Sequence, residues 1–133
     1  MKYETLNHSK FLLMYHIIFV CKYRKKLLFE PINEKIKQII FDISKESDFE
    51  ILEMETDEDH IHFLIKSEPK VSVLAIVRRL KQESTIIRLW KTQKEYLRKY
   101  YWNENTLWSD GYFAFTIGNV CKEAAEYYIR NQG

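Results

Sequence analysis

Two histidines separated by one residue stand at the start of an apolar, β-prone run, Asp59-His60-Ile61-His62-Phe63-Leu64-Ile65. Residues i and i+2 of a β-strand project to the same face, so the imidazoles of His60 and His62 should lie side by side with apolar residues behind them. Two imidazoles on one face make half of a metal site, and the acidic residues from Glu53 to Asp59 suit a cation nearby. The same pattern also fits an ordinary half-buried strand, so further ligands must be sought elsewhere in the chain.

Length and composition indicate one globular domain. The chain has 133 residues, 46% of them hydrophobic, and only three glycines and two prolines. We therefore expect a single domain over residues 1–133, without linkers or repeats. No apolar run reaches the roughly 18 residues of a membrane span, and the apolar run from Phe11 to Cys21 is unlike a signal peptide. We expect a cytoplasmic protein with no membrane partner, in which Cys21 and Cys121 are reduced apolar residues.

Basic residues are concentrated in two parts of the chain, although the net charge is only +2. One cluster covers residues 22–26 and a longer one residues 78–99, while acidic residues gather between Asp42 and Asp59. Basic zones beside an acidic pocket suit a phosphate backbone that is brought to a cation, although charge runs are also usual on solvated surfaces. Our candidates for contact with nucleic acid are Lys22, Arg24, Lys25, Arg79 and Lys81.

The periodicity of apolar residues predicts the order of the elements. Residues 11–21 are apolar on both faces, which is typical of a central strand. Helical spacing over residues 32–45 is followed by two alternating stretches, 49–55 and 59–65, that should form a hairpin. Further segments are predicted as a helix over residues 71–90, an irregular aromatic stretch over 96–111, a strand over 112–117 and a terminal helix over 120–132.

This order of elements matches a split βαβ arrangement. We expect an α+β fold with a ferredoxin-like, RRM-like antiparallel sheet, helices on one face, and an additional C-terminal helix. The first and third strands should be central. Ile61, Phe63 and Ile65 should then face the helices, which leaves His60 and His62 on the open face.

The predicted terminal helix offers further functional groups. Residues four apart on a helix are neighbours, so Tyr128 and Gln132 share a face. The carbonyl oxygen of Gln132 can complete a site with His60 and His62. Mixed imidazole and oxygen ligation suits Mg²⁺ or Mn²⁺, with Zn²⁺ as an alternative.

Five short motifs succeed one another along nearly the whole chain. They are Tyr15-His16-Ile17-Ile18-Phe19 with Lys22-Tyr23-Arg24-Lys25, Asp59-His60-Ile61-His62, Leu107-Trp108-Ser109 through Phe113, Gly118-Asn119, and Tyr128-Ile129-Arg130-Asn131-Gln132. In this order they resemble the single-tyrosine transposases of small bacterial insertion sequences (TnpA type), in the HUH endonuclease superfamily.

The resemblance implies an enzyme that nicks and rejoins single-stranded DNA. Tyr128 would form a 5′-phosphotyrosyl intermediate as the catalytic residue of the C-terminal helix, while His60, His62 and Gln132 would hold the divalent ion. The resemblance also implies recognition of a DNA hairpin and a homodimer whose active sites are shared between subunits. Tyr127 lies about 100° around the helix from Tyr128 and does not share the face of Gln132.

Several alternatives stay open. The same sheet serves non-catalytic nucleic-acid-binding modules, but those carry aromatic residues and a glycine on the third strand, where this chain has His60 and His62. A metal-dependent hydrolase that activates water needs no tyrosine. Asp59 either orients a ligand histidine or simply ends a turn, and His16 is expected to be a core or interface residue. Core or dimer contacts are expected for most of Tyr100, Tyr101, Trp102 and Trp108, although one of them can instead stack on an unpaired base.

Overall fold

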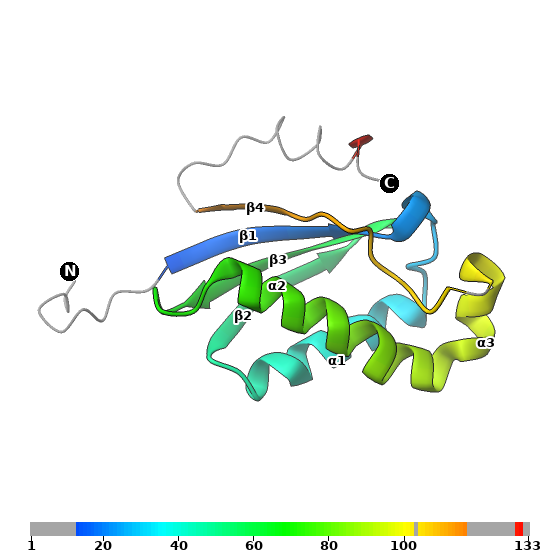
Figure 1. Cartoon of the computed structure of the whole chain (residues 1–133), viewed down its shortest axis with the longest axis horizontal. Coiled ribbons are helices and arrows are strands. Elements are labelled where there is room, and N and C mark those ends of the chain that lie inside the picture. Colours follow the sequence, from blue (N-terminus) through cyan, green and yellow to red (C-terminus); the bar gives the residue numbers. More distant parts are fainter. Residues whose placement is uncertain (1–12, 103, 117–129, 132–133) are drawn as a thin grey trace, which may run out of the picture.

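The computed structural model describes residues 13–102, 104–116 and 130–131 (Figure 1). Within these residues the elements are β1 (Leu13–Val20), η2 (Lys22–Arg24), α1 (Ile32–Lys45), β2 (Phe49–Thr56), β3 (His60–Ser67), α2 (Val73–Gln82), η3 (Glu83–Leu89), α3 (Trp90–Tyr101) and β4 (Phe113–Thr116). The predicted terminal helix lies outside the described residues, except for Arg130 and Asn131, whose backbone is helical.

The four strands form one antiparallel sheet in the order β2-β3-β1-β4. The first and third strands are central, as the sequence predicts for a ferredoxin-like sheet. The register pairs Ile18 with His62 and Val20 with His60. The histidine end of β3 therefore lies beside the end of β1, directly before η2.

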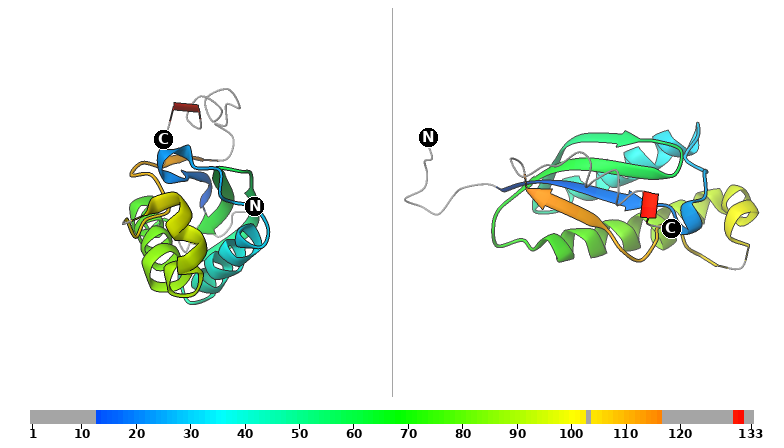
Figure 2. Two further views of the ribbon diagram at one scale, coloured as in Figure 1. Left: turned by 90° about the vertical axis from the view of Figure 1, so that its right-hand side faces the viewer. Right: turned by 90° about the horizontal axis from the view of Figure 1, so that it is seen from above.

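The helices cover one face of this sheet and leave the other face free of α1, α2 and α3 (Figures 1 and 2). Alternate residues of β3 supply the centre of the core, because Ile61, Phe63 and Ile65 are fully buried against the helices. Helix α1 contributes one buried stripe at helical spacing, as expected for an amphipathic helix: Ile32, Ile36, Ile40 and Ile43. The α+β, ferredoxin-like prediction is confirmed.

The second helical region is longer and less regular than its sequence suggests. Instead of one helix over residues 71–90, α2 leads through the π-helical segment η3 into α3, so the prediction of an irregular stretch from Tyr96 is wrong as far as Tyr101. The reason is that tyrosines can pack an apolar ring and still use a polar hydroxyl. Tyr96 donates to the carbonyl of Leu27 at 2.7 Å and Tyr101 to that of Lys22 at 3.0 Å, which ties α3 to the chain around η2. Within the described part of the chain, no helix is long and apolar enough to cross a membrane.

Candidate active site

His60 and His62 project from the helix-free face of β3. Burial alternates strictly along this strand, with the two histidines partly exposed and Ile61 and Phe63 fully buried. The predicted pairing of two imidazoles on one face is thus present.

His60 has a fixed orientation because its ring is hydrogen-bonded to the preceding residue. Its Nδ1 atom lies 2.9 Å from Oδ1 of Asp59, a side chain whose residue is only 7% exposed. A carboxylate can only accept a hydrogen bond, so Nδ1 of His60 is the donor in this contact, and Nε2 is the ring nitrogen left for another partner. Asp59 therefore orients His60, and the alternative of a simple turn residue does not account for this contact.

Arg24 holds the other oxygen of the same carboxylate. Its Nε atom donates to Oδ2 of Asp59 at 3.3 Å, and the backbone N–H of Cys21 donates to the carbonyl of Asp59 at 2.8 Å. Burial alone would raise the pKa of Asp59, but the hydrogen bonds from His60 and Arg24 outweigh it and keep the pKa below its usual value. Asp59 is therefore ionised at neutral pH and can serve both partners.

Arg24 also reaches the C-terminal segment. Its Nη1 atom donates to the carbonyl oxygen of Arg130 at 3.1 Å. Arg24 thus joins the Asp59–His60 pair to a residue two positions from Tyr128 and two from Gln132. Tyr128 and Gln132 themselves lie outside the described residues.

His62 sits in a more crowded electrostatic environment. Burial lowers its pKa, and repulsion from His60 and His16 lowers it further, partly opposed by Glu55 and Glu53. Glu55 faces His62 directly across the β2–β3 ladder. The neutral imidazole that results at pH 7 is the form that binds metals.

The donors present fit part of a metal site. Within the described ranges, no group of three or more His, Cys, Asp or Glu side chains converges to hold a metal ion. His60 and His62 offer two imidazoles on one face of the sheet, and a further ligand must come from elsewhere. His16, by contrast, stacks on Phe115 with ring centroids 5.0 Å apart, which agrees with the expectation of a packing role.

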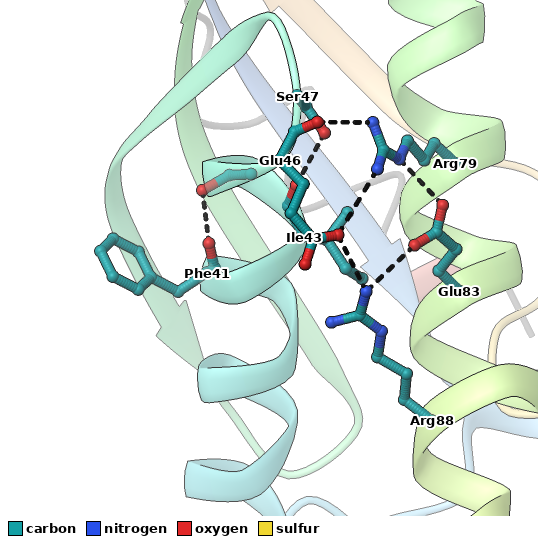
Figure 3. Close-up of polar contacts among 8 residues, drawn as sticks. Phe41, Ile43, Glu46, Ser47, Arg79, Glu83 and Arg88 are labelled. Atoms are coloured by element: carbon teal, nitrogen blue, oxygen red, sulfur yellow. Dashed lines mark hydrogen bonds and ion pairs between the residues drawn. The ribbon is translucent and has the colours of Figure 1, made fainter.

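The five basic candidates fall into two groups. Lys22, Arg24 and Lys25 lie in or directly after η2, beside the histidine end of β3. Arg79 instead joins Glu46 and Glu83, in a network with Arg88 that ties α1 to the following helices (Figure 3). These ion pairs connect the C-terminal end of α1 to α2 and η3, so we assign Arg79 a structural role.

The ammonium group of Lys81 is hydrogen-bonded to main-chain carbonyls of its own chain. Its ammonium donates to three successive carbonyls that lead into β4, those of Ser109 at 2.7 Å, Asp110 at 3.0 Å and Gly111 at 2.7 Å. Burial lowers its pKa to about 8, opposed by the Asp110 carboxylate. A run of basic residues in a sequence does not reveal such internal partners.

Sequence reasoning missed the part that η2 plays in the site. Tyr23 and Arg24 both have positive φ, 61° and 51°, which is unusual for residues other than glycine. This backbone turns Arg24 back toward Asp59. A signal was available, since Lys22-Tyr23-Arg24 directly follows a buried strand, but charge alone suggested only a DNA contact.

The fold and the site together define a class of protein, a ferredoxin-like domain with a His-x-His pair on the open face of its sheet, in which a buried aspartate orients the first histidine. Residues 9–132 match the family described as "Transposase IS200 like", and the chain belongs to that family. It is thus a DNA transposase of the IS200-like type, which confirms the resemblance seen in its motifs.

Individual relatives agree with this family. The chain is 29% identical over 120 residues to the ISDra2 transposase TnpA of Deinococcus radiodurans, covering 90% of this chain and 84% of the relative. It is 29% identical over 129 residues to the IS200 transposase of Salmonella typhimurium, covering 97% and 82%.

Solved structures show the same fold. A crystal structure of a Deinococcus radiodurans protein described as a transposase aligns with a TM-score of 0.83 at 25% identity, covering 98% of this chain and 96% of that one. A REP-associated tyrosine transposase bound to a REP hairpin aligns with a TM-score of 0.53 at 13% identity, covering 88% and 62%.

Proposed function

We propose that this transposase nicks and rejoins single-stranded DNA at the hairpin-marked ends of its element, with Tyr128 as the nucleophile. The phenolic oxygen attacks a phosphodiester phosphorus, the bond from phosphorus to the 3′-oxygen breaks, and the 5′-phosphate stays on Tyr128. The phenol proton is lost and the departing 3′-oxygen gains one. Because the phosphotyrosyl link keeps the energy of the phosphodiester, a later 3′-hydroxyl can reseal the strand without ATP.

The observation that carries this proposal is the chain of contacts from His60 through Asp59 to Arg24. The contact of Asp59 with Nδ1 of His60 leaves Nε2 of the ring for another partner, and Arg24 reaches on to the carbonyl of Arg130. An oriented imidazole with a buried carboxylate behind it is a recurrent feature of metal-ligating histidines. Family membership supports the same function.

His60, His62 and Gln132 would hold Mg²⁺ or Mn²⁺ in this proposal. A bound divalent ion supplies charge neutralisation at the scissile phosphate and orients it for in-line attack. The lowered pKa of His62 favours its neutral form, and the contact of Nδ1 of His60 with Asp59 leaves Nε2 available, so both rings suit that role. A tyrosine has a pKa near 10 in water, so the nucleophile needs such stabilisation of charge at neutral pH.

The DNA would approach along η2. Lys22, Arg24 and Lys25 supply positive charge beside the histidines. Arg79 and Lys81 belong to α2, which covers the opposite face of the sheet, so the proposed interface does not include them. A protein of the same fold is bound to a REP hairpin, which supports a hairpin as the DNA partner.

We further propose that the protein acts as a homodimer with shared active sites. The support is the family resemblance together with the position of Gly118-Asn119, between β4 and the tyrosine segment. In this arrangement, His60 and His62 of one subunit work with Tyr128 and Gln132 of the other.

A covalent-adduct assay tests the nucleophile. The protein is incubated with a single-stranded hairpin oligonucleotide and Mn²⁺, and the adduct is detected by denaturing gel electrophoresis. We expect an adduct with the unmodified protein and with Tyr127→Phe, the matched control, and none with Tyr128→Phe or after chelation of the metal. An adduct with Tyr128→Phe would show that another residue is the nucleophile, and cleavage without any adduct would favour activated water.

A further inference from the structure

Three residues other than glycine have positive φ in the described part of the chain, and all three belong to segments at one end of the molecule. They are Tyr23 (61°), Arg24 (51°) and Trp102 (41°). Figures 1 and 2 show η2 and the C-terminal end of α3 at this common end. Such backbone is disfavoured for residues with a Cβ and gathers at functional sites. The contact with Asp59 explains Arg24, but it does not explain Tyr23 or Trp102.

Trp102 occupies a position that suits glycine. It follows the last residue of α3, and its backbone N–H donates to the carbonyl of Arg98 at 3.0 Å. Its backbone angles are φ 41° and ψ −99°. Helices commonly end on a glycine in positive-φ backbone. The residue is nevertheless 76% exposed, the highest value among the large apolar residues of the described part of the chain. The backbone conformation thus favours glycine over tryptophan at this position, and the exposed side chain does not contribute to the core.

Tyr23 is exposed and held in place at the same end. Its residue is 52% exposed, and its hydroxyl donates to Glu104 at 2.9 Å. The ring lies 6.4 Å from that of Tyr101, the residue before Trp102, and the ammonium of Lys22 lies 5.4 Å from its centroid. Glu104 also pairs with Lys22 at 3.3 Å. Tyr23 therefore presents a positioned aromatic ring with a cation beside it.

The chemistry of this surface matches unpaired nucleobases. Exposed aromatic rings accept stacked bases of any sequence, and neighbouring cations follow the phosphates. Lys22, Arg24 and Lys25 provide those cations, and Arg24 connects the surface to the Asp59–His60 pair. In a duplex, the faces of the bases are already stacked on one another, so exposed aromatic rings of this kind would favour single strands.

We propose that Tyr23 and Trp102 form a stacking surface for unpaired bases of the DNA strand that leads to the His60 end of the sheet. The proposal rests on the proposed function for its ligand. It adds a physical basis for single-strand preference that is separate from the nucleophile and from the metal ligands.

Tryptophan fluorescence gives a direct readout. Trp90 and Trp108 are each only 5% exposed, so a stacked base should quench mainly Trp102. We titrate the full-length protein with an unstructured oligothymidine and with a duplex of the same length. Quenching is expected with the single strand and not with the duplex, and Trp102→Phe should lose it.

Binding affinity separates stacking from charge. By fluorescence anisotropy of labelled oligothymidine, Trp102→Ala should bind at least about fivefold more weakly, while Trp102→Phe should recover most of the affinity. Phe41→Ala is the matched control, because Phe41 is also an exposed aromatic (38%) with a lysine ammonium, that of Lys45, 5.1 Å from its ring. We expect its affinity to be unchanged.

Trp102→Gly keeps the proposal testable independently of folding. Glycine relieves the positive φ, so this variant should unfold at the same or a higher temperature and yet bind the single strand as weakly as Trp102→Ala. Unchanged affinity of both variants would overturn the stacking proposal. So would a weaker subunit association in sedimentation with no effect on DNA binding, since Trp102 would then be a subunit contact.

The two proposals fail in different ways. If Tyr128 forms the covalent adduct while the Trp102 variants bind normally, only the stacking surface is wrong. If the unmodified protein prefers the duplex over the single strand, both are wrong.

Discussion

The Oδ1 atom of Asp59 lies 2.9 Å from Nδ1 of His60, and the other oxygen of this carboxylate accepts from Nε of Arg24 at 3.3 Å. One buried acid therefore sets the tautomer of a candidate metal ligand and anchors a cation that reaches the carbonyl of Arg130. The geometry makes Asp59 a positioning residue for both halves of the proposed site.

Replacing Asp59 by Asn should weaken metal binding without removing a ligand. The amide can accept from only one of its two partners, so either His60 or Arg24 loses its acceptor. Loss of such a supporting partner typically costs about 10- to 100-fold in metal affinity. Calorimetric titration with Mn²⁺ measures the effect. Asp57→Asn makes the same chemical change at an exposed position of the same turn and should bind Mn²⁺ normally; equal affinities for both variants would contradict the role of Asp59.

Stability should fall as the pH drops below the usual range of a histidine, and His62 should contribute to that fall. Its folded pKa is lower than 6.5. At a pH between the folded pKa of His62 and its ordinary pKa of 6.5, the unfolded chain binds more protons than the folded one. The free energy of unfolding therefore decreases as the pH decreases. Urea unfolding in chelator, at about pH 7.5 and about pH 5.5, should show a smaller decrease for His62→Leu than for the unmodified protein. An identical decrease would mean that His62 does not titrate in this way.

Lys81→Met should destabilise the fold. Three carbonyls of residues 109–111 lose their donor, and the strand β4 that follows loses its anchor. Charged hydrogen bonds are strong, so we expect a loss of about 2 to 4 kcal/mol in the free energy of unfolding. Denaturant unfolding measures it, and a variant as stable as the unmodified protein would exclude the structural role.

Lys25→Ala, unlike Lys81→Met, should change DNA binding and leave the stability of the fold nearly unchanged. We expect little change in stability but a weaker salt dependence of binding to single-stranded DNA. The slope of log affinity against log salt concentration should shrink by about 0.7, the effect of one phosphate contact on a single strand. An unchanged slope would remove Lys25 from the interface.

Mixed dimers test whether the active site is shared. Tyr128→Phe and His60→Ala should each be inactive alone, since each lacks one half of every site. If a subunit lends its tyrosine to its partner, unfolding and refolding the two together should restore up to about half a dimer's activity, because one of the two sites in each heterodimer is intact. Cleavage is followed on a hairpin oligonucleotide. No recovery, with heterodimers confirmed by mass, would mean that each subunit completes its own site.

Much of the fold prediction depended on the spacing of apolar residues along the sequence. The strict alternation in β3 predicted which face His60 and His62 occupy, and helical spacing predicted α1 from Ile32 to Lys45. Both patterns depend only on neighbours in the sequence, so they survive in the folded chain. The extension of α3 through Tyr96 and Tyr101 was missed, because their hydroxyls find acceptors near η2 that are about seventy to eighty residues away.

The sequence by itself determined the family, the sheet order and the face on which His60 and His62 lie, because periodicity and ordered motifs are properties of the linear chain. Only the tertiary structure decided which charges serve the site. Arg24 turns through a positive-φ backbone to meet Asp59, while Lys81 is drawn inward to three carbonyls. The physical reason is that a charged side chain takes its role from the partners that folding brings within hydrogen-bond distance, and the sequence spacing of lysines and arginines does not encode those partners.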